Sequence, residues 1–210
     1  MVHAMHARLH RLHEGMFGLA HHASWYDRSS GRLARPLYRH IADDVAAATL
    51  PDGALVLDVG TGPGRVPRLI AQRCPRLVVE GIDLSEEMIK QARATVGAAA
   101  PGRPSYSVAD VTHLPHADGS IDLVVSSLSL HHWGDVPAGL SEIRRVLKPG
   151  GRAWIYDVKG VLTRAARQAE AAGHAVAVEP YARPRTGRPS LSDLPARLAG
   201  ALLGRLVIQA

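Results

Sequence analysis

The sequence is poor in cysteine, aromatic residues and long apolar runs. Its single cysteine, Cys74, excludes an internal disulfide and a cysteine-based zinc site, and it fits a reducing compartment. No apolar run approaches the roughly 20 residues that span a bilayer. The N-terminal stretch MVHAMHARLHRLHEG lacks the apolar core of a signal peptide. We therefore expect a cytoplasmic protein without a membrane span.

Lysine is also scarce, and the net charge of +6 comes mainly from arginines that are scattered along the chain. A nucleic-acid-binding surface instead clusters its cations against phosphates and stacks bases on aromatic rings. Three tryptophans, five tyrosines and one phenylalanine supply little stacking surface. The composition therefore favours a solvated basic surface over a nucleic-acid partner.

Two helices are predicted before residue 51. Apolar residues at three- and four-residue steps indicate the first, namely Val2, Met5, Leu9, Leu12, Met16 and Leu19. A stripe of histidines lies beside them, but no acidic or sulfur ligand completes a metal site there, so we predict no metal. The second helix is predicted over residues 37–50. We expect residues 1–50 to form a helical lid and residues 51–210 the main domain.

From residue 51 onward, strands and helices alternate. Strands are predicted over residues 55–59, 77–82, 105–109, 121–126 and 152–156, and helices over 66–73, 86–96 and 136–147. The tail adds a helix at 163–172, a strand at 175–178, a loop at 181–189, a helix at 192–203 and an apolar run at 206–208. The Lys-Pro-Gly-Gly segment at 148–151 is predicted to turn the chain from helix into strand. This alternation predicts a parallel sheet covered by helices on both faces.

The first predicted strand of this domain runs into a glycine-rich turn, LDVGTGPG, in which Gly60, Gly62 and Gly64 alternate with other residues. Glycines at a strand-to-helix turn let the backbone approach a nucleotide-like ligand. A dinucleotide-binding turn would carry its third glycine one position later, where this chain has Arg65. The motif therefore predicts a cofactor site but does not by itself identify the cofactor.

Carboxylates stand at the ends of three successive predicted strands: Asp58, Asp83 and Asp110. Because ligands of open parallel sheets bind outside the carboxyl ends of the strands, Asp83 is placed to accept hydrogen bonds from ribose hydroxyls. Asp110 can accept from an adenine amine, and Val111 can offer its backbone amide to the ring. Met88, one turn into the next helix, can pack beside the adenine. An isolated aspartate after a strand is usually a turn former, but three in succession favour a nucleoside site.

Five blocks in this order and spacing give the sequence a specific resemblance: LDVGTGPG, GIDLS, ADVTHLP, DLVVSSLSLHHW and EIRRVLKPGG. Together they resemble the small-molecule class I S-adenosylmethionine (SAM) dependent methyltransferases of the ubiquinone and menaquinone biosynthesis type. The resemblance covers residues 54–157. It implies a Rossmann-like αβα sandwich with a mostly parallel seven-stranded sheet and an antiparallel edge strand. It also implies SAM as cofactor and S-adenosylhomocysteine (SAH) as product.

The resemblance carries site residues onto matching positions of this chain. It implies that the methionine portion of SAM is surrounded by Asp58, Gly60, Thr61, Gly62 and Gly64, the ribose by Asp83 with Leu84 beside it, and the adenine by Met88, Asp110 and Val111. The backbone at Ser126 and Ser127 would meet the methionine amino group. Family members commonly carry a Tyr-Asp pair upstream, so Tyr26 is a candidate to cover the SAM carboxylate or the methyl-transfer site, besides anchoring the N-terminal segment.

Methyl transfer needs mainly alignment of the acceptor and exclusion of water. A hydroxyl acceptor would gain from a general base, for which His131 and His132 are candidates, but paired histidines are frequent at this place in the family across different substrates, which favours shaping of the pocket floor as their role. We expect a small-molecule acceptor, with O-, N- and C-methylation open, and a pocket completed by the first fifty residues, the tail or a second subunit of a homodimer. Alternatives are a SAM-binding protein without methyl transfer, an RNA methyltransferase, and a nicotinamide-dependent oxidoreductase.

Overall fold

The computed structural model describes residues 23–96, 102–180 and 202–210, and of residues 23–33 the backbone alone. The chain divides into two compact units, Met1–Arg35 and Pro36–Ala210. Helix α2 (Ala23–Ala47) contains Pro36 and contributes its second half to the larger unit. The predicted helix over residues 37–50 corresponds to this half. The predicted helix over residues 2–19 lies outside the described residues, and the lid of residues 1–50 stays a prediction.

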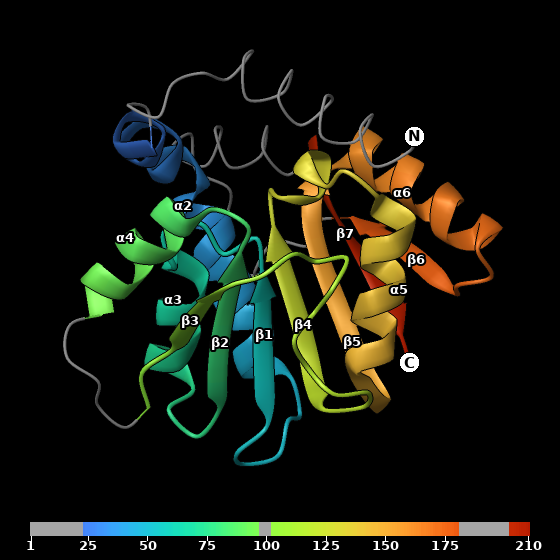
Figure 1. The fold of residues 1–210 in the computed structure, drawn as a ribbon, viewed down its shortest axis with the longest axis horizontal. Coiled ribbons are helices and arrows are strands. Elements are labelled where there is room, and N and C mark those ends of the chain that lie inside the picture. The colour runs from blue at the N-terminus through green and yellow to red at the C-terminus, as the bar shows by residue number, and fades with distance from the viewer. Residues whose placement is uncertain (1–22, 97–101, 181–201) are drawn as a thin grey trace, which may run out of the picture. The chain divides into compact units, whose positions relative to one another are not determined.

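The larger unit is built on a seven-stranded sheet with the order β3-β2-β1-β4-β5-β7-β6 (Figure 1). Its strands are β1 (Leu55–Val59), β2 (Val78–Asp83), β3 (Ser105–Val108), β4 (Ile121–Ser127), β5 (Leu147–Val158), β6 (Val176–Pro180) and β7 (Leu203–Gln209). Strands β1 to β5 pair in parallel. The antiparallel strand is β7, which lies between β5 and the edge strand β6. The mostly parallel seven-stranded sheet is therefore confirmed, with its antiparallel strand one place in from the edge.

Helices connect the strands and cover both faces of the sheet. They are α3 (Arg65–Arg73), α4 (Glu86–Val96), the short 3-10 helix η1 (Leu130–His132), α5 (Val136–Val146) and α6 (Lys159–Ala171). One core lies between the sheet and helices α5 and α6, and a second core packs α2 and α3 against the other face (Figure 1). Because both faces are covered, β1 is buried almost throughout.

A polar cluster fastens α2 to the sheet within this unit. Tyr156 of β5 donates a 2.6 Å hydrogen bond to Asp44 of α2. Arg205 of β7 donates to the same carboxylate at 3.0 Å. Arg205 also stacks over the Trp154 ring at 5.1 Å. Charge-assisted bonds of this kind fix the helix in register on the sheet.

Most predicted boundaries agree with the structure, and the exceptions have physical reasons. Strand β1 and helix α4 have the predicted bounds, and Ser85 caps α4 because its hydroxyl accepts the Met88 amide hydrogen at 3.3 Å. The segment at residues 148–151 is part of β5 rather than a separate turn, and a register irregularity between Ile121 and Leu123 of the partner strand accommodates it. The predicted loop at 181–189 and most of the predicted helix at 192–203 lie outside the described residues.

Candidate functional site

The glycine turn joins β1 to α3 at the carboxyl edge of the sheet. Gly60, Gly62 and Gly64 all adopt left-handed backbone conformations, with φ of 69°, 53° and 75°, which residues with a Cβ rarely adopt. The Thr61 amide donates to the Ile82 carbonyl of β2 at 2.8 Å. The turn is therefore held against the neighbouring strand and is rigidly shaped.

Two of these glycines also leave room for side chains of this chain. A Cβ at Gly60 would lie 2.4 Å from the Ser129 hydroxyl, and one at Gly64 would lie 2.5 Å from the Tyr106 hydroxyl. Tyr106 donates a buried 3.0 Å hydrogen bond to the Gly64 carbonyl. Around Gly62, in contrast, a Cβ would meet nothing within 4 Å. Open space for a ligand along this turn thus lies at Gly62.

Asp58, the last but one residue of β1, is a buried carboxylate beside this turn. Its exposed fraction is 1%. One oxygen, Oδ2, accepts a 2.7 Å hydrogen bond from the Thr61 hydroxyl, whereas Oδ1 has no partner among the described residues. Burial raises the pKa of Asp58 to about 7, the Thr61 hydrogen bond opposes this rise, and the nearby charge of Asp83 adds to it. A buried acceptor without a donor is costly, so this oxygen is suited to a cationic or hydrogen-bonding ligand group.

Asp83 ends β2 and bridges two backbone segments. Its Oδ2 accepts from the Gly62 amide at 2.8 Å, and its Oδ1 accepts from the Ser85 amide at 2.9 Å. Each carboxylate oxygen has two lone pairs, so both retain acceptor capacity for a ligand hydroxyl. The structure therefore brings Asp83 to the glycine turn, as the sequence predicted, and gives it a second task in shaping that turn.

The residues predicted to contact the nucleoside lie around the ends of β2 and β3. Leu84 is 59% exposed although it is apolar, Met88 is half-buried, and Asp110 is exposed. The Asp110 carboxylate accepts the Thr112 amide hydrogen at 2.8 Å, as in an ordinary turn, and Val111 packs at the margin of the core. Asp83 and Val108 are register partners, which places this group at the same edge as the glycine turn.

The loop after β4 is organised by Ser129, which the sequence reasoning missed. Its hydroxyl lies 2.8 Å from the Ser126 hydroxyl, donates to the Val59 carbonyl at 3.2 Å and accepts from the Trp133 indole at 3.1 Å. Ser126 is buried and is the register partner of Val59. Ser127 is half-buried at the end of β4. This loop is thereby fixed to the residue that precedes the glycine turn.

His131 and His132 are the last two residues of η1, which directly follows this loop, and their ring centroids lie 4.0 Å apart. His131 Nδ1 lies 3.0 Å from Asp157 Oδ2 and 3.1 Å from Oδ1. Asp157, on β5, has an exposed fraction of 0%, and its Oδ1 also accepts the Val158 amide hydrogen at 2.7 Å. The sequence reasoning missed Asp157, although an acidic residue near the end of a buried strand is the signal that identified Asp58 and Asp83.

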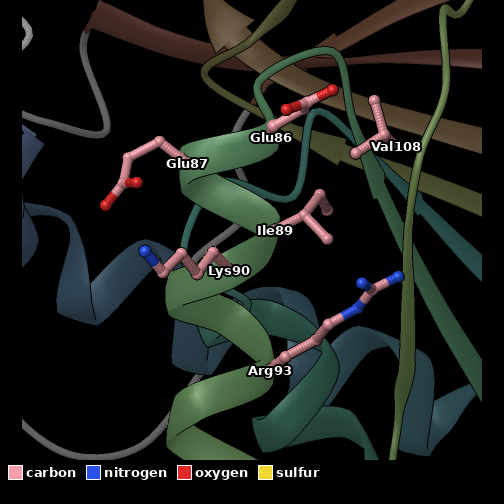
Figure 2. A pocket seen from close by; sticks show the side chains of 6 residues that line it. All are labelled: Glu86, Glu87, Ile89, Lys90, Arg93 and Val108. Carbon is pink, nitrogen blue, oxygen red and sulfur yellow. The ribbon is translucent and has the colours of Figure 1, made fainter.

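Two further findings concern the rest of the described chain. Tyr26 lies on the backbone of α2, in the part whose side chains are not described. A hollow of about 590 Å³ lies between α4 and β3, lined by charged and apolar side chains (Figure 2): Glu86, Glu87, Ile89, Lys90, Arg93 and Val108. None of the predicted site residues lines it.

Among the residues that the structure describes, no group of three or more histidine, cysteine, aspartate or glutamate side chains is placed to hold a metal ion. No helix in the described part of the chain is both long enough and apolar enough to cross a membrane.

Comparison with known proteins adds the family. Residues 57–155 match the family described as a methyltransferase domain. A ubiquinone/menaquinone biosynthesis C-methyltransferase of Geotalea daltonii is 40% identical over 109 residues, which cover 51% of this chain and 46% of that protein. A malonyl-[acyl-carrier protein] O-methyltransferase of Salmonella typhimurium is 38% identical over 138 residues, which cover 64% of this chain and 49% of that protein. The chain thus spans about half the length of these curated relatives.

The fold agrees with this assignment. The crystal structure of a SAM-dependent methyltransferase from Aquifex aeolicus matches with a TM-score of 0.63 and 20% sequence identity, covering 82% of this chain and 88% of that one. At this identity the likeness concerns the Rossmann-like fold alone. Taken with the matching residues, it confirms the resemblance that the five sequence blocks indicated: residues 57–155 match a methyltransferase domain and are similar to those of class I SAM-dependent methyltransferases.

Proposed function

We propose that this protein transfers a methyl group from SAM to a small-molecule acceptor. The observation that carries the proposal is the fully buried Asp58 carboxylate, whose Oδ1 has no partner among the described residues, beside a glycine turn that is open at Gly62. The amino-acid portion of SAM carries an ammonium group, which would supply the missing donor. The residues present therefore fit the cofactor.

The other site residues keep the roles that the sequence predicted. Asp83 has acceptor capacity left for the ribose hydroxyls after binding two backbone amides. Leu84 offers an exposed apolar side chain beside Asp83, where the ribose is expected. Gly60, Thr61, Gly62 and Gly64 would surround the methionine portion together with the backbone of Ser126 and Ser127, and Met88, Asp110 and Val111 would surround the adenine. Tyr26 stays a candidate for the acceptor side.

When bound, SAM supplies a sulfonium methyl group that is already electrophilic. The chain then has to bind SAM and the acceptor, orient them toward each other and exclude water, which a preorganised site can do. The Ser129 network serves this purpose by fixing the loop after β4 to the carbonyl that precedes Gly60. The small-molecule acceptor is supported by the scarcity of aromatic residues and by relatives named for small-molecule biosynthesis.

Calorimetric titration with SAH tests the proposal. We expect wild-type protein to bind SAH, and Asp83→Ala to weaken binding by about 1–3 kcal/mol through loss of hydrogen bonds to the ribose. Asp52→Ala is the matched control, because Asp52 is exposed and lies at the opposite end of β1. Thermal unfolding of Asp83→Ala must show a folded protein, since this carboxylate also holds the glycine turn. Binding of NAD without any response to SAH would overturn the proposal.

A further inference from the structure

One side of α5 faces the segment that joins β3 to β4. Gly139, Glu142 and Arg145 follow one another at steps of three residues along α5, so they are neighbours on the helix surface. The segment, residues 109–120, runs from β3 across to α5 before it enters β4 (Figure 1). It carries Asp110, which is expected at the adenine. Helix α5 therefore borders the segment on which recognition of the base would depend.

Arg145 uses every donor of its guanidinium in this contact. Nε and Nη2 donate to the two carboxylate oxygens of Glu142, each at 2.8 Å. Nη2 also donates to the Leu114 carbonyl at 3.0 Å, and Nη1 donates to the His116 carbonyl at 2.9 Å and to Asp118 Oδ1 at 2.6 Å. These bonds engage all five donors that a guanidinium has. A lysine, with a single ammonium group, could not reproduce the arrangement.

Glu142 completes the contact from the same helix. Its Oε2 accepts the Leu114 amide hydrogen at 2.9 Å, so the amide and the carbonyl of Leu114 are both bonded to side chains of α5. The hydrogen bond from Arg145 lowers the pKa of Glu142, which keeps this acceptor ionised at neutral pH. Leu114 is itself buried in the core. The two side chains thus hold the backbone of Leu114 as a neighbouring strand would.

The turn that carries Asp110 ends directly before this held backbone. The Asp110 carbonyl accepts the His113 amide hydrogen at 3.0 Å, and Asp110 Oδ1 accepts the Thr112 amide hydrogen at 2.8 Å. Val111, inside the turn, packs against α5, since a Cβ at Gly139 would lie 3.3 Å from its side chain. The turn is therefore fixed by β3 on one side and by α5 on the other.

We propose that Arg145 and Glu142 are positioning residues for recognition of the adenine: they set the turn that presents Asp110 to the exocyclic amine. This inference rests on the proposed function. A carboxylate distinguishes an amine from a carbonyl oxygen only while it is held in place, because a displaced carboxylate can reach another donor on the base. Arg145 and Glu142 act through the backbone of Leu114 and do not contact the base themselves.

Calorimetric titration with two ligands tests the proposal: SAH, and S-inosylhomocysteine, in which a carbonyl oxygen replaces the exocyclic amine of the adenine. The oxygen cannot donate to Asp110, so we expect the wild type to bind SAH at least about tenfold more tightly. Hypoxanthine donates from N1 instead, which a released Asp110 can reach. In Arg145→Met the preference should therefore fall to within about threefold. Arg144→Met is the matched control and should keep the wild-type preference, because Arg144 bonds to His174.

A pair of substitutions at Glu142 separates positioning from folding. Glu142→Gln keeps an oxygen that can accept from the Leu114 amide and should retain most of the preference, whereas Glu142→Ala should lose it. Thermal unfolding identifies the variants that are folded, and the ratio of the two affinities is compared in those.

Two results would overturn the inference. One is a wild-type ratio in the folded Arg145 and Glu142→Ala variants, with both affinities lowered equally, which would show a structural role alone. The other is a wild type that binds the two ligands with equal affinity. Failure of the wild type to bind SAH would instead refute the proposed methyltransferase function.

Discussion

Replacing Asp58 by asparagine should change how the stability of this protein depends on pH. Burial raises the pKa of this carboxyl from 3.8 to about 7 in the native state. Between these two values the native state holds a proton that the unfolded chain has lost. The native state therefore loses stability as the pH rises through this window, and the loss is complete above about pH 7. Asparagine is nearly isosteric and has no proton to lose, so the variant lacks this contribution.

The magnitude follows from the two pKa values. One pKa unit corresponds to about 1.4 kcal/mol, so a rise from 3.8 to about 7 corresponds to about 4 kcal/mol. The unfolding free energy of Asp58→Asn minus that of the wild type should therefore increase by about 4 kcal/mol between about pH 4 and about pH 8. Taking this difference cancels the other titrating groups that both proteins share.

Urea unfolding at a series of pH values measures this difference. A second variant, Thr61→Val, removes the 2.7 Å hydrogen bond by which the Thr61 hydroxyl stabilises the Asp58 carboxylate. Because this bond lowers the pKa of Asp58, its loss should extend the pH range over which stability falls to higher pH. A difference between Asp58→Asn and the wild type that does not change over this pH range would refute the reasoning.

Ligand binding gives an independent reading of the same group. If the ammonium of SAH pairs with Asp58, SAH affinity should rise with pH below about 7, by up to about tenfold per pH unit, and level off above it. 5′-Methylthioadenosine lacks the amino-acid portion and should bind without this dependence. Equal pH profiles for the two ligands would place the ammonium elsewhere.

Three further substitutions test the packing of the site by urea unfolding. Gly60→Ala places a residue with a Cβ at a φ of 69°, and that Cβ would lie 2.4 Å from the Ser129 hydroxyl, so the variant should lose at least about 2 kcal/mol of unfolding free energy. Adding Ser129→Gly to this variant should recover part of the lost stability. Strictly additive effects of the two substitutions would contradict the contact. Tyr106→Phe removes the donor to a buried backbone carbonyl and should cost about 1–2 kcal/mol; an unchanged stability would count against that bond. Tyr156→Phe removes the 2.6 Å bond to Asp44 and should cost about 1–3 kcal/mol, whereas a stabilised variant would show that the polar cluster does not hold α2.

The sequence predicted the elements best where local and tertiary preferences agree. Strand β1 was located correctly because its residues are apolar and buried on both faces, and α4 because Ser85 caps it. Strand β5 begins earlier than predicted, since proline and glycine signal a turn locally while pairing with β4 absorbs them in an irregular register. A cross-strand pairing of this kind leaves no local signal.

The sequence by itself determined which chemical groups stand at the strand ends, namely the glycine turn, Asp58 and Asp83, and the five ordered blocks indicated the resemblance to SAM-dependent methyltransferases. The tertiary structure alone decided the partners of these groups. Pairing of β1 with β4 brings the Ser129 side chain into the space above Gly60, and pairing of β4 with β5 brings Asp157 beside His131. Each pair consists of residues that are far apart in the chain. Burial makes these contacts energetically important, because a carboxylate that is shielded from water is costly to ionise unless a hydrogen-bonding or cationic partner compensates it.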